Sequence, residues 1–225
     1  MDGTGKLFEP IKGILPTHID VEVIPLSRLK DGDAKSQAEE IAALIGNGEF
    51  VIFAESYSGA IAYELCQIPD LNINHVFFAA SFLSRPSYIS KFGYLAPLSI
   101  LRVKLIPTFI LSWLFFGSLN RPDLVDLFLC SLKLVSNNTL RQRLKRIANL
   151  NEPESKIRTP CTYLQATKDK LVSKRAIAVF QKLCVNLDVK QINGGHFIAQ
   201  SNPEKCAEAI SGVFALLPKP ASGTG

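Results

Sequence analysis

The sequence predicts an α/β protein with a mostly parallel, doubly wound sheet. Short apolar runs alternate with segments of helical periodicity along most of the chain, and this order is typical of parallel strands covered by helices on both faces. The chain has 225 residues, of which 47% are hydrophobic, and this is enough for one domain with a full core.

The first third of the chain supplies the opening elements of this fold. We expect a helix over 7–15, a strand over 21–24, a helix from Asp33 to Gly46, a strand from Phe50 that leads into a helix ending at 68, and a strand over 75–81. Asp33 suits a helix N-cap because its carboxylate can accept hydrogen bonds from free N–H groups, and Gly46 suits the C-terminal end. The residues between them place Ala38, Ile41 and Ile45 on one face.

The last third continues the same alternation. We expect a strand over 159–166, a helix over 174–183, a strand over 185–192 and a helix that begins at Pro203. The segment 84–150 between the two thirds has helical patterning and no convincing strand, so we expect a core of 1–83 and 151–217 with a helical insertion. Residues 218–225 are mostly Pro, Gly, Ser and Thr, and they predict a flexible tail.

Ser56 stands where the apolar strand turns into a helix. A serine at such a corner exposes its hydroxyl but needs a strained backbone, and its neighbours must be small because strand and helix pass close together. Ala54, Ser58 and Gly59 meet that requirement, although the pattern is A-x-S-x-S-G and not G-x-S-x-G. The alternative is a buried strand followed by an ordinary helix, in which the serine has no function.

An acid and a base follow later in the chain. Asp169 comes directly after the strand predicted over 159–166, and His196 lies in a loop with Gly194 and Gly195 after the strand predicted over 185–192. The chain order is therefore Ser, Asp, His. A serine hydroxyl needs an imidazole to take its proton, and the imidazole needs a carboxylate to hold its tautomer, so these three residues are candidates for a catalytic triad.

These features together make the chain resemble an α/β-hydrolase of the esterase or lipase type over nearly its whole length. The segment 54–59 is similar to the nucleophile corner of that family, and Asp169 and His196 match its acid and base loops. The first ten residues resemble the loop that supplies an oxyanion-hole donor. The resemblance implies that the N–H groups of Tyr57 and of Met1 or Asp2 bind the oxyanion.

The family's third strand should lie immediately before that first loop, and this chain has no sequence there. We expect an amino-terminal truncation. The alternatives are that residues 20–25 pair directly beside residues 50–53, or that another chain donates the missing strand.

In the resembled family, the helical insertion over 84–150 is a cap above the active site. Its first half is very apolar, and Phe109, Trp113 and Phe116 are the residues we expect to bind an acyl group. The run 105–116 is shorter than the ~18 residues that a membrane span needs, but it leaves open a contact of the cap with a lipid surface. The cationic segment 141–146 is expected to be a solvated helix face.

Charge and cysteine usage exclude several other functions. The net charge of +5 is spread along the chain without a basic block, so we expect no nucleic-acid partner. The cysteines are odd in number and form no C-x-x-C pair, and we expect neither disulfides nor a metal, and no cofactor. They are Cys66, Cys130, Cys161, Cys184 and Cys206. Buried, reduced cysteines and the lack of a visible secretory signal favour a cytoplasmic location.

The sequence thus predicts a serine hydrolase that cleaves a small-molecule carboxylic ester through an acyl-enzyme, with an apolar acyl group. One alternative is an inactive relative of the α/β-hydrolases that binds an apolar ligand or a protein partner. Another is a thioesterase or a carbon–carbon hydrolase that uses the same triad.

Overall fold

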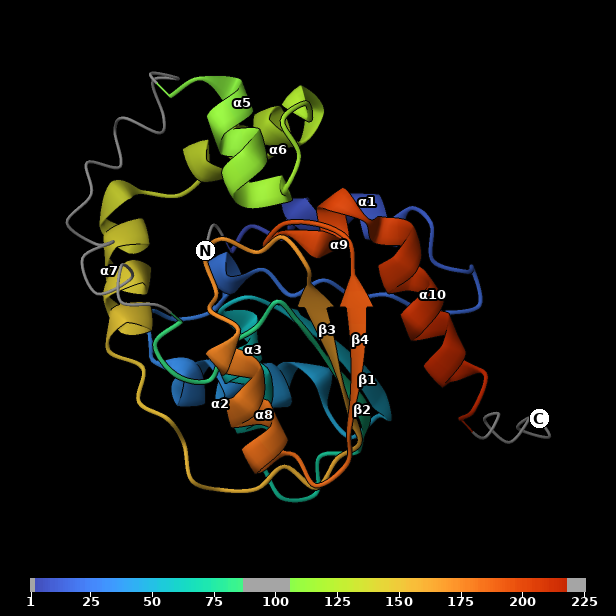
Figure 1. Ribbon diagram of the computed structural model, residues 1–225. Helices are drawn as coiled ribbons and strands as arrows, with labels where there is room; N and C mark the ends of the chain where they lie inside the picture. The colour runs from blue at the N-terminus through green and yellow to red at the C-terminus, as the bar shows by residue number, and fades with distance from the viewer. Residues whose placement is uncertain (1–2, 87–105, 218–225) are drawn as a thin grey trace.

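Four parallel strands form a single sheet in the computed structural model, which describes residues 3–86 and 106–217. The strands are β1 (Phe50–Glu55), β2 (Ile73–Ala79), β3 (Cys161–Ala166) and β4 (Leu187–Ile192), and they lie side by side in chain order (Figure 1). Every neighbouring pair is parallel. The predicted α/β class with a parallel sheet is confirmed.

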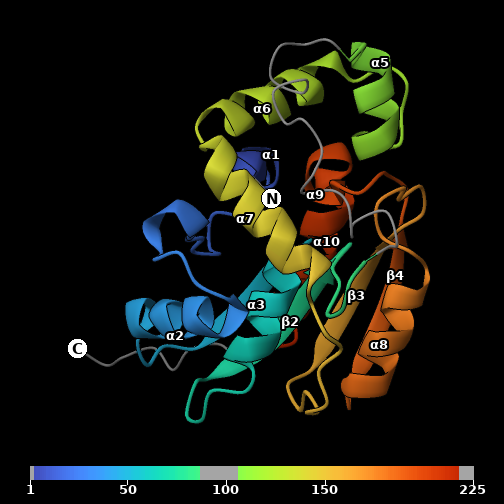
Figure 2. The same cartoon turned by 90° about the vertical axis from the view of Figure 1, so that its left-hand side faces the viewer.

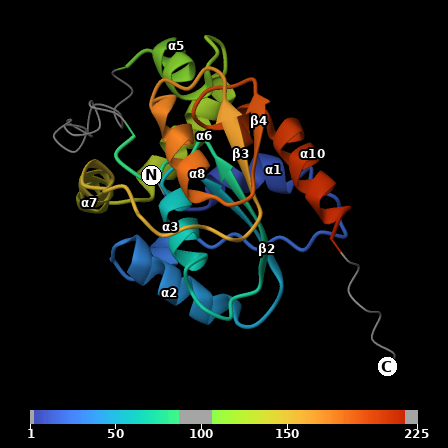
Figure 3. The same cartoon turned by 60° about the horizontal axis from the view of Figure 1, so that its bottom comes forward.

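Helices cover both faces of this sheet, as Figure 3 shows. One face carries α1 (Glu9–Lys12), α9 (Ile198–Ser201) and α10 (Pro203–Phe214), and the other carries α3 (Ser58–Leu65) and α8 (Arg175–Leu183), with α2 (Ala34–Ile45) packed on α3. Side chains alternate between the faces along each strand. In β2, for example, Phe77 packs toward α10 and Phe78 toward α8, and both are fully buried.

A layer of helices lies beyond the carboxyl ends of the strands (Figures 1 and 2). It comprises α5 (Thr108–Leu111), the π-helical turn η4 (Ser112–Phe116) and α6 (Pro122–Lys133). From this layer, α7 (Asn137–Ala148) runs down beside the core toward α2 and α3, and we call residues 106–150 the cap. The cap has its own apolar core, which includes Phe115, Phe116 and Phe128. Leu7, from the short turn η1 (Lys6–Phe8), and Phe197 close this core from the side of the sheet.

The strand predicted over 21–24 is wrong. Residues 20–25 are extended but belong to no strand in the described part of the chain, and there β1 pairs only with β2. Val21 packs in the cluster beneath α10, whereas Ile24 packs in the cluster around α2 and α3. Residues three apart in an extended segment point to opposite faces, so this packing matches a segment that lies along the edge of the sheet, but the segment forms no ladder with β1. It then enters the short turn η2 (Leu26–Arg28).

Two other expectations change in the structure. The helix predicted over 7–15 is shorter, since only η1 and α1 form there. Arg143, expected on a solvated face, is only 4% exposed. This face of α7 packs against the amino-terminal loop, where the Arg143 side chain contacts Gly3. No helix among residues 3–86 and 106–217 is both long and apolar enough to cross a membrane.

Predicted helix ends are confirmed at α2. The Asp33 carboxylate accepts a hydrogen bond from Ser36 N–H at 2.9 Å, and the pKa of Asp33 is lowered mainly by this bond. Gly46 ends the helix with φ 69° and ψ −149°, a backbone conformation that is essentially restricted to glycine.

The contact between α3 and β2 leaves no room for a side chain at Gly59. A Cβ there would lie 2.6 Å from Ser81 Cβ and 2.7 Å from Ser81 Oγ. Ser81 cannot withdraw easily, because its hydroxyl donates to Ala54 O at 2.8 Å and Tyr163 donates to its carbonyl oxygen at 3.0 Å. This close approach brings the start of α3 against the carboxyl ends of β1 and β2.

We therefore expect Gly59→Ala to lower the free energy of unfolding by about 1–3 kcal/mol, through overpacking against Ser81. Gly212→Ala is the matched control, since Gly212 is a helical glycine at which a Cβ would meet no atom within 4 Å. This control should raise stability by about 0.5–1 kcal/mol. Urea denaturation measures both, and equal effects of the two substitutions would contradict the packing.

Candidate active site

Ser56 occupies a sharp corner between β1 and α3. Its φ of 61° is left-handed, which is unusual for a residue other than glycine and indicates local backbone strain. The corner is held by backbone hydrogen bonds: Ser56 N–H donates to Ala79 O at 3.0 Å, and Gly59 N–H donates to Ser56 O at 3.1 Å. The side chain of Ser56 consequently projects above the carboxyl edge of the sheet.

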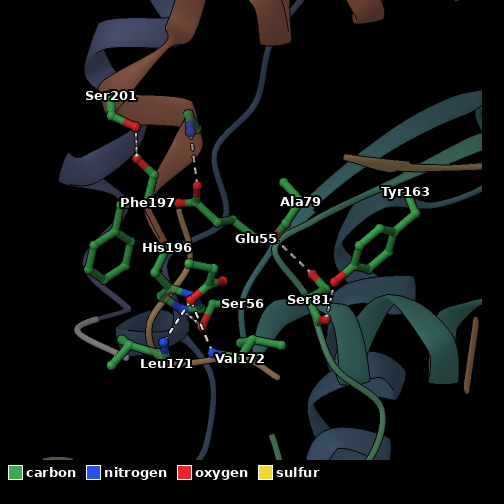
Figure 4. Close-up of polar contacts among 12 residues, drawn as sticks. Glu55, Ser56, Ala79, Ser81, Tyr163, Leu171, Val172, His196, Phe197 and Ser201 are labelled. Atoms are coloured by element: carbon green, nitrogen blue, oxygen red, sulfur yellow. Dashed lines mark hydrogen bonds and ion pairs between the residues drawn. The ribbon is translucent and has the colours of Figure 1, made fainter. Parts of the chain in front are cut away.

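The structure brings the three residues Ser56, His196 and Asp169 into one hydrogen-bonded chain (Figure 4). Ser56 Oγ lies 2.8 Å from His196 Nε2, and His196 Nδ1 lies 3.0 Å from Asp169 Oδ2. An ionised carboxylate can only accept hydrogen bonds, so Nδ1 carries the proton and Nε2 is free to accept the serine proton. The side chains of His196 and Asp169 are only 4% and 9% exposed, which protects the chain from water.

Asp169 is fixed by its own loop. Its Oδ1 accepts hydrogen bonds from Leu171 N–H at 2.8 Å and from Val172 N–H at 3.0 Å, and this leaves Oδ2 for the histidine. Burial by itself raises the pKa of the Asp169 carboxyl, but the adjacent His196 and the two N–H donors outweigh burial and hold that pKa below its ordinary value. The carboxylate is therefore ionised at neutral pH.

The acid and base loops meet because they follow neighbouring parallel strands. Asp169 comes three residues after β3 ends at Ala166, and His196 comes after β4 ends at Ile192. Parallel strands place these ends at the same edge of the sheet. Lys168 N–H also donates to Gly194 O at 2.9 Å, which ties the two loops together.

A cavity beside Ser56 reaches under the amino-terminal loop. Its lining residues are Gly3, Gly5, Leu7, Phe8, Ile24, Leu26, Glu55, Ser56, Tyr57, Ser58 and Phe197. Tyr57 is the N-cap of α3, so its N–H stands at the positive end of a helix next to Ser56. Gly3 and Gly5 adopt φ of 66° and 81°, and a Cβ on Gly5 would lie 2.9 Å from Val23. Met1 and Asp2 lie outside the described residues.

The three expected acyl-binding residues are not brought together around Ser56. Phe109 and Trp113 lie on the outside of the cap and are 55% and 46% exposed, and Lys170 Nζ sits 5.3 Å from the centre of the Trp113 ring. Phe116 is buried in the core of the cap, with its ring 5.8 Å from that of Phe197. None of the three lines the cavity beside Ser56.

Comparisons with known proteins support the architecture. Neither a family model nor a curated protein sequence matches this chain. Among solved structures, the esterase EaEST from Exiguobacterium antarcticum matches with 16% identity and a TM-score of 0.71, over 94% of this chain and 88% of that one. MGS-M2, an α/β hydrolase enzyme from a Medee basin deep-sea metagenome library, matches with 16% identity and a TM-score of 0.61, over 86% and 76% of the two chains. The epoxide hydrolase CorEH matches with 13% identity and a TM-score of 0.64, over 83% and 76%.

This chain has the α/β-hydrolase fold. At these identities the likeness concerns the fold, and one fold supports several chemistries, so the reaction has to be argued from the side chains at the site. The α/β-hydrolase fold accounts for the location of the site, at the carboxyl ends of the strands and beneath the cap (Figure 2).

Glu55 and Gln200 form a second buried polar link that the sequence-based prediction missed. Glu55 Oε1 accepts from Ala199 N–H and Oε2 accepts from Gln200 Nε2, each at 3.0 Å. Gln200 Nε2 also donates to Leu7 O at 2.9 Å. One carboxylate thus joins the end of β1, the helix α9 that follows His196, and the turn η1 that follows the amino-terminal loop. Figure 4 shows Glu55 reaching away from the triad toward α9.

A signal for this link was present in the sequence. Val51, Phe53 and Glu55 lie on the same side of β1, so the alternation that places the first two in the core also places the carboxylate there. A charged residue at the core end of an apolar strand needs buried hydrogen-bond donors. Gln200 could not have been paired with it from sequence, because the two meet only through the fold.

Among the residues that the structure describes, no group of three or more His, Cys, Asp or Glu is placed to hold a metal ion.

Burial gives Glu55 a testable effect on stability. Desolvation raises the pKa of Glu55, and the hydrogen bonds from Ala199 and Gln200 offset this only in part. A carboxyl whose pKa is raised on folding binds more protons in the native state than in the unfolded state. The free energy of unfolding therefore falls as the pH rises above the carboxyl's unfolded-state pKa of about 4.3.

Glu55→Gln removes this titration, so the free energy of unfolding of the variant relative to that of wild type should increase from pH 4 to pH 7. Urea unfolding across this range measures the difference, and Glu39→Gln on the exposed side of α2 is the control. A difference for Glu55→Gln that does not change with pH would contradict the assignment.

Proposed function

We propose that this protein is a serine hydrolase that cleaves a carboxylic ester through an acyl-enzyme. The observation that carries the proposal is the hydrogen-bonded chain from Ser56 through His196 to Asp169, at a corner where Ser56 has φ of 61°. The similar solved structures include an esterase and an epoxide hydrolase, and a serine hydroxyl paired with a neutral imidazole is suited to acyl transfer.

The proposed reaction has two halves. Ser56 Oγ attacks the ester carbonyl while His196 Nε2 takes the hydroxyl proton, and the imidazolium then gives this proton to the leaving alcohol. Water next attacks the acyl-enzyme, with His196 again accepting and returning a proton. Asp169 stays ionised throughout and stabilises the imidazolium. The same steps would hydrolyse a thioester.

The oxyanion needs donors that are in place before the reaction. We propose Tyr57 N–H as one donor, because it follows the nucleophile at the start of α3. The second donor would come from the amino-terminal loop, for which Met1 and Asp2 remain the candidates. Gly3 lines the cavity beside Ser56, and this supports placing that loop next to the reacting carbonyl.

We propose that the acyl group enters the cavity under the amino-terminal loop. The apolar residues Leu7, Ile24, Leu26 and Phe197 contribute to its lining. These apolar side chains favour an apolar acyl group, since such a group loses contact with water when it packs against them.

Replacement of the nucleophile tests the proposal directly. Ser56→Ala should lower kcat for a p-nitrophenyl ester by about 10⁴-fold or more, because no other group can form the acyl-enzyme. A fluorophosphonate probe should label wild type at Ser56 and leave the variant unlabelled. Ser58→Ala is the matched control, since Ser58 is a nearby hydroxyl on the same cavity, and it should keep probe labelling. Ester turnover that survives in Ser56→Ala would exclude this mechanism.

We also propose that the outside of the cap contacts an anionic lipid surface. Phe109 and Trp113 are one helical turn apart and both exposed, with Ile110 39% exposed between them. Lys170 adds a cation beside the Trp113 ring. Aromatic and aliphatic side chains next to a cation are suited to the boundary between lipid headgroups and acyl chains.

Trp113 is the single tryptophan of the chain, so its fluorescence reports on this surface alone. Vesicles that contain phosphatidylglycerol should shift its emission to the blue, and Phe109→Ser should weaken vesicle binding several-fold. Leu44→Ala is the matched control because Leu44 is 56% exposed on α2, away from the cap. An emission spectrum that vesicles leave unchanged would contradict the lipid contact.

A further inference from the structure

The cap and the loop that carries His196 approach so closely that two glycines are in contact. A Cβ on Gly117, which ends η4, would lie 2.7 Å from Gly195 N and 2.9 Å from Lys168 Cβ. A Cβ on Gly195 would lie 2.6 Å from Phe115 O. Real Cβ atoms essentially never approach other atoms to such distances, so this contact has no room for a side chain at either glycine.

Hydrogen bonds join the two backbones at the same place. Gly195 N–H donates to Phe116 O at 3.0 Å, and Phe197 N–H donates to Phe115 O at 3.1 Å. The last carbonyl groups of a helical segment have no partner within it, and here the carbonyls at the end of η4 find theirs in the histidine loop. The residues on both sides of His196 are therefore anchored to the cap.

The loop that carries the acid joins this contact as well. Lys168 directly precedes Asp169, and its N–H donates to Gly194 O at 2.9 Å. Its Cβ is one of the atoms nearest to Gly117. Gly117 thus touches the loops of both Asp169 and His196.

Aromatic rings of the cap pack against Phe197, the residue that follows His196. The Phe197 ring centre lies 5.8 Å from that of Phe115 and 5.5 Å from that of Phe128. On its other side, Phe197 meets the His196 ring edge-on, at 5.1 Å between centres. Figure 4 shows Phe197 beside the triad. Because packed rings have little room to shift, a displacement at the end of η4 is transmitted to the imidazole.

We propose that Gly117 is a positioning residue, through which the cap sets the His196–Asp169 pair in register with Ser56. A side chain at Gly117 would push the histidine loop and the Lys168 backbone away from η4, and would lengthen the hydrogen bonds at both imidazole nitrogens. The kinetic part of this inference rests on the proposed hydrolase function, whereas the geometric part does not.

Gly46→Ala is the control for Gly117→Ala. Both glycines have φ of 69°, but ψ is −149° at Gly46 and 17° at Gly117, so alanine suffers more backbone strain at Gly46, whereas its Cβ meets no atom within 4 Å there. Backbone strain alone would therefore act more strongly in the control. In Gly117→Ala we expect the downfield proton resonance of His196 Nδ1–H to shift or broaden. We also expect kcat for a p-nitrophenyl ester to fall about 10- to 100-fold with KM nearly unchanged, because a small misplacement of a catalytic group is costly. Gly46→Ala should leave both quantities at their wild-type values.

Equal behaviour of the two variants in both measurements would overturn the proposal. Should wild type fail to turn over the ester while the resonance still responds to Gly117→Ala and not to Gly46→Ala, the positioning role is supported and the hydrolase function is not. Should Gly117→Ala fail to fold, hydrogen exchange on wild type decides: slow exchange at the amides of both Gly195 and Phe197 supports the anchoring, and exchange at unprotected-loop rates overturns it.

Discussion

The close approach of α3 to β2 is the constraint on which the rest of the site depends. Ser56 keeps a left-handed backbone because α3 starts immediately after β1 and packs against the end of β2. That packing requires a glycine at position 59, since Ser81 occupies the space a methyl group would need. Ser81 is itself held by Ala54 O and by Tyr163. The strain at Ser56 is thus maintained by ordinary buried packing and hydrogen bonds beneath it.

Two carboxylates near Ser56 have opposite properties because their surroundings differ. Asp169 faces His196 and two backbone donors, which favour its charge despite burial and lower its pKa. Glu55 is buried on the other side of the corner with two neutral donors, and burial raises its pKa. The first carboxylate orients the imidazole. The second holds α9 and η1 against β1, and so joins the segment after His196 to the segment after the amino-terminal loop.

The cap contributes to the site through its backbone and not only as a cover. The end of η4 accepts hydrogen bonds from residues on either side of His196, and its apolar core includes Phe197. The cap and the α/β core therefore share the histidine loop as a common structural part. A substitution at the end of η4 would therefore act first on the backbone of the histidine loop.

The sequence alone determined the alternation of strands and helices, the caps of α2, and the order of Ser56, Asp169 and His196. These depend on periodicity and on local residue chemistry, which each segment carries by itself. Only the tertiary structure decided that 21–24 forms no strand, that Phe109 and Trp113 face outward, and that Arg143 is buried. It also decided the pairing of Glu55 with Gln200 and of Gly117 with Gly195. These contacts join segments distant in the chain, and local patterns contain no information on which distant partner a residue will meet.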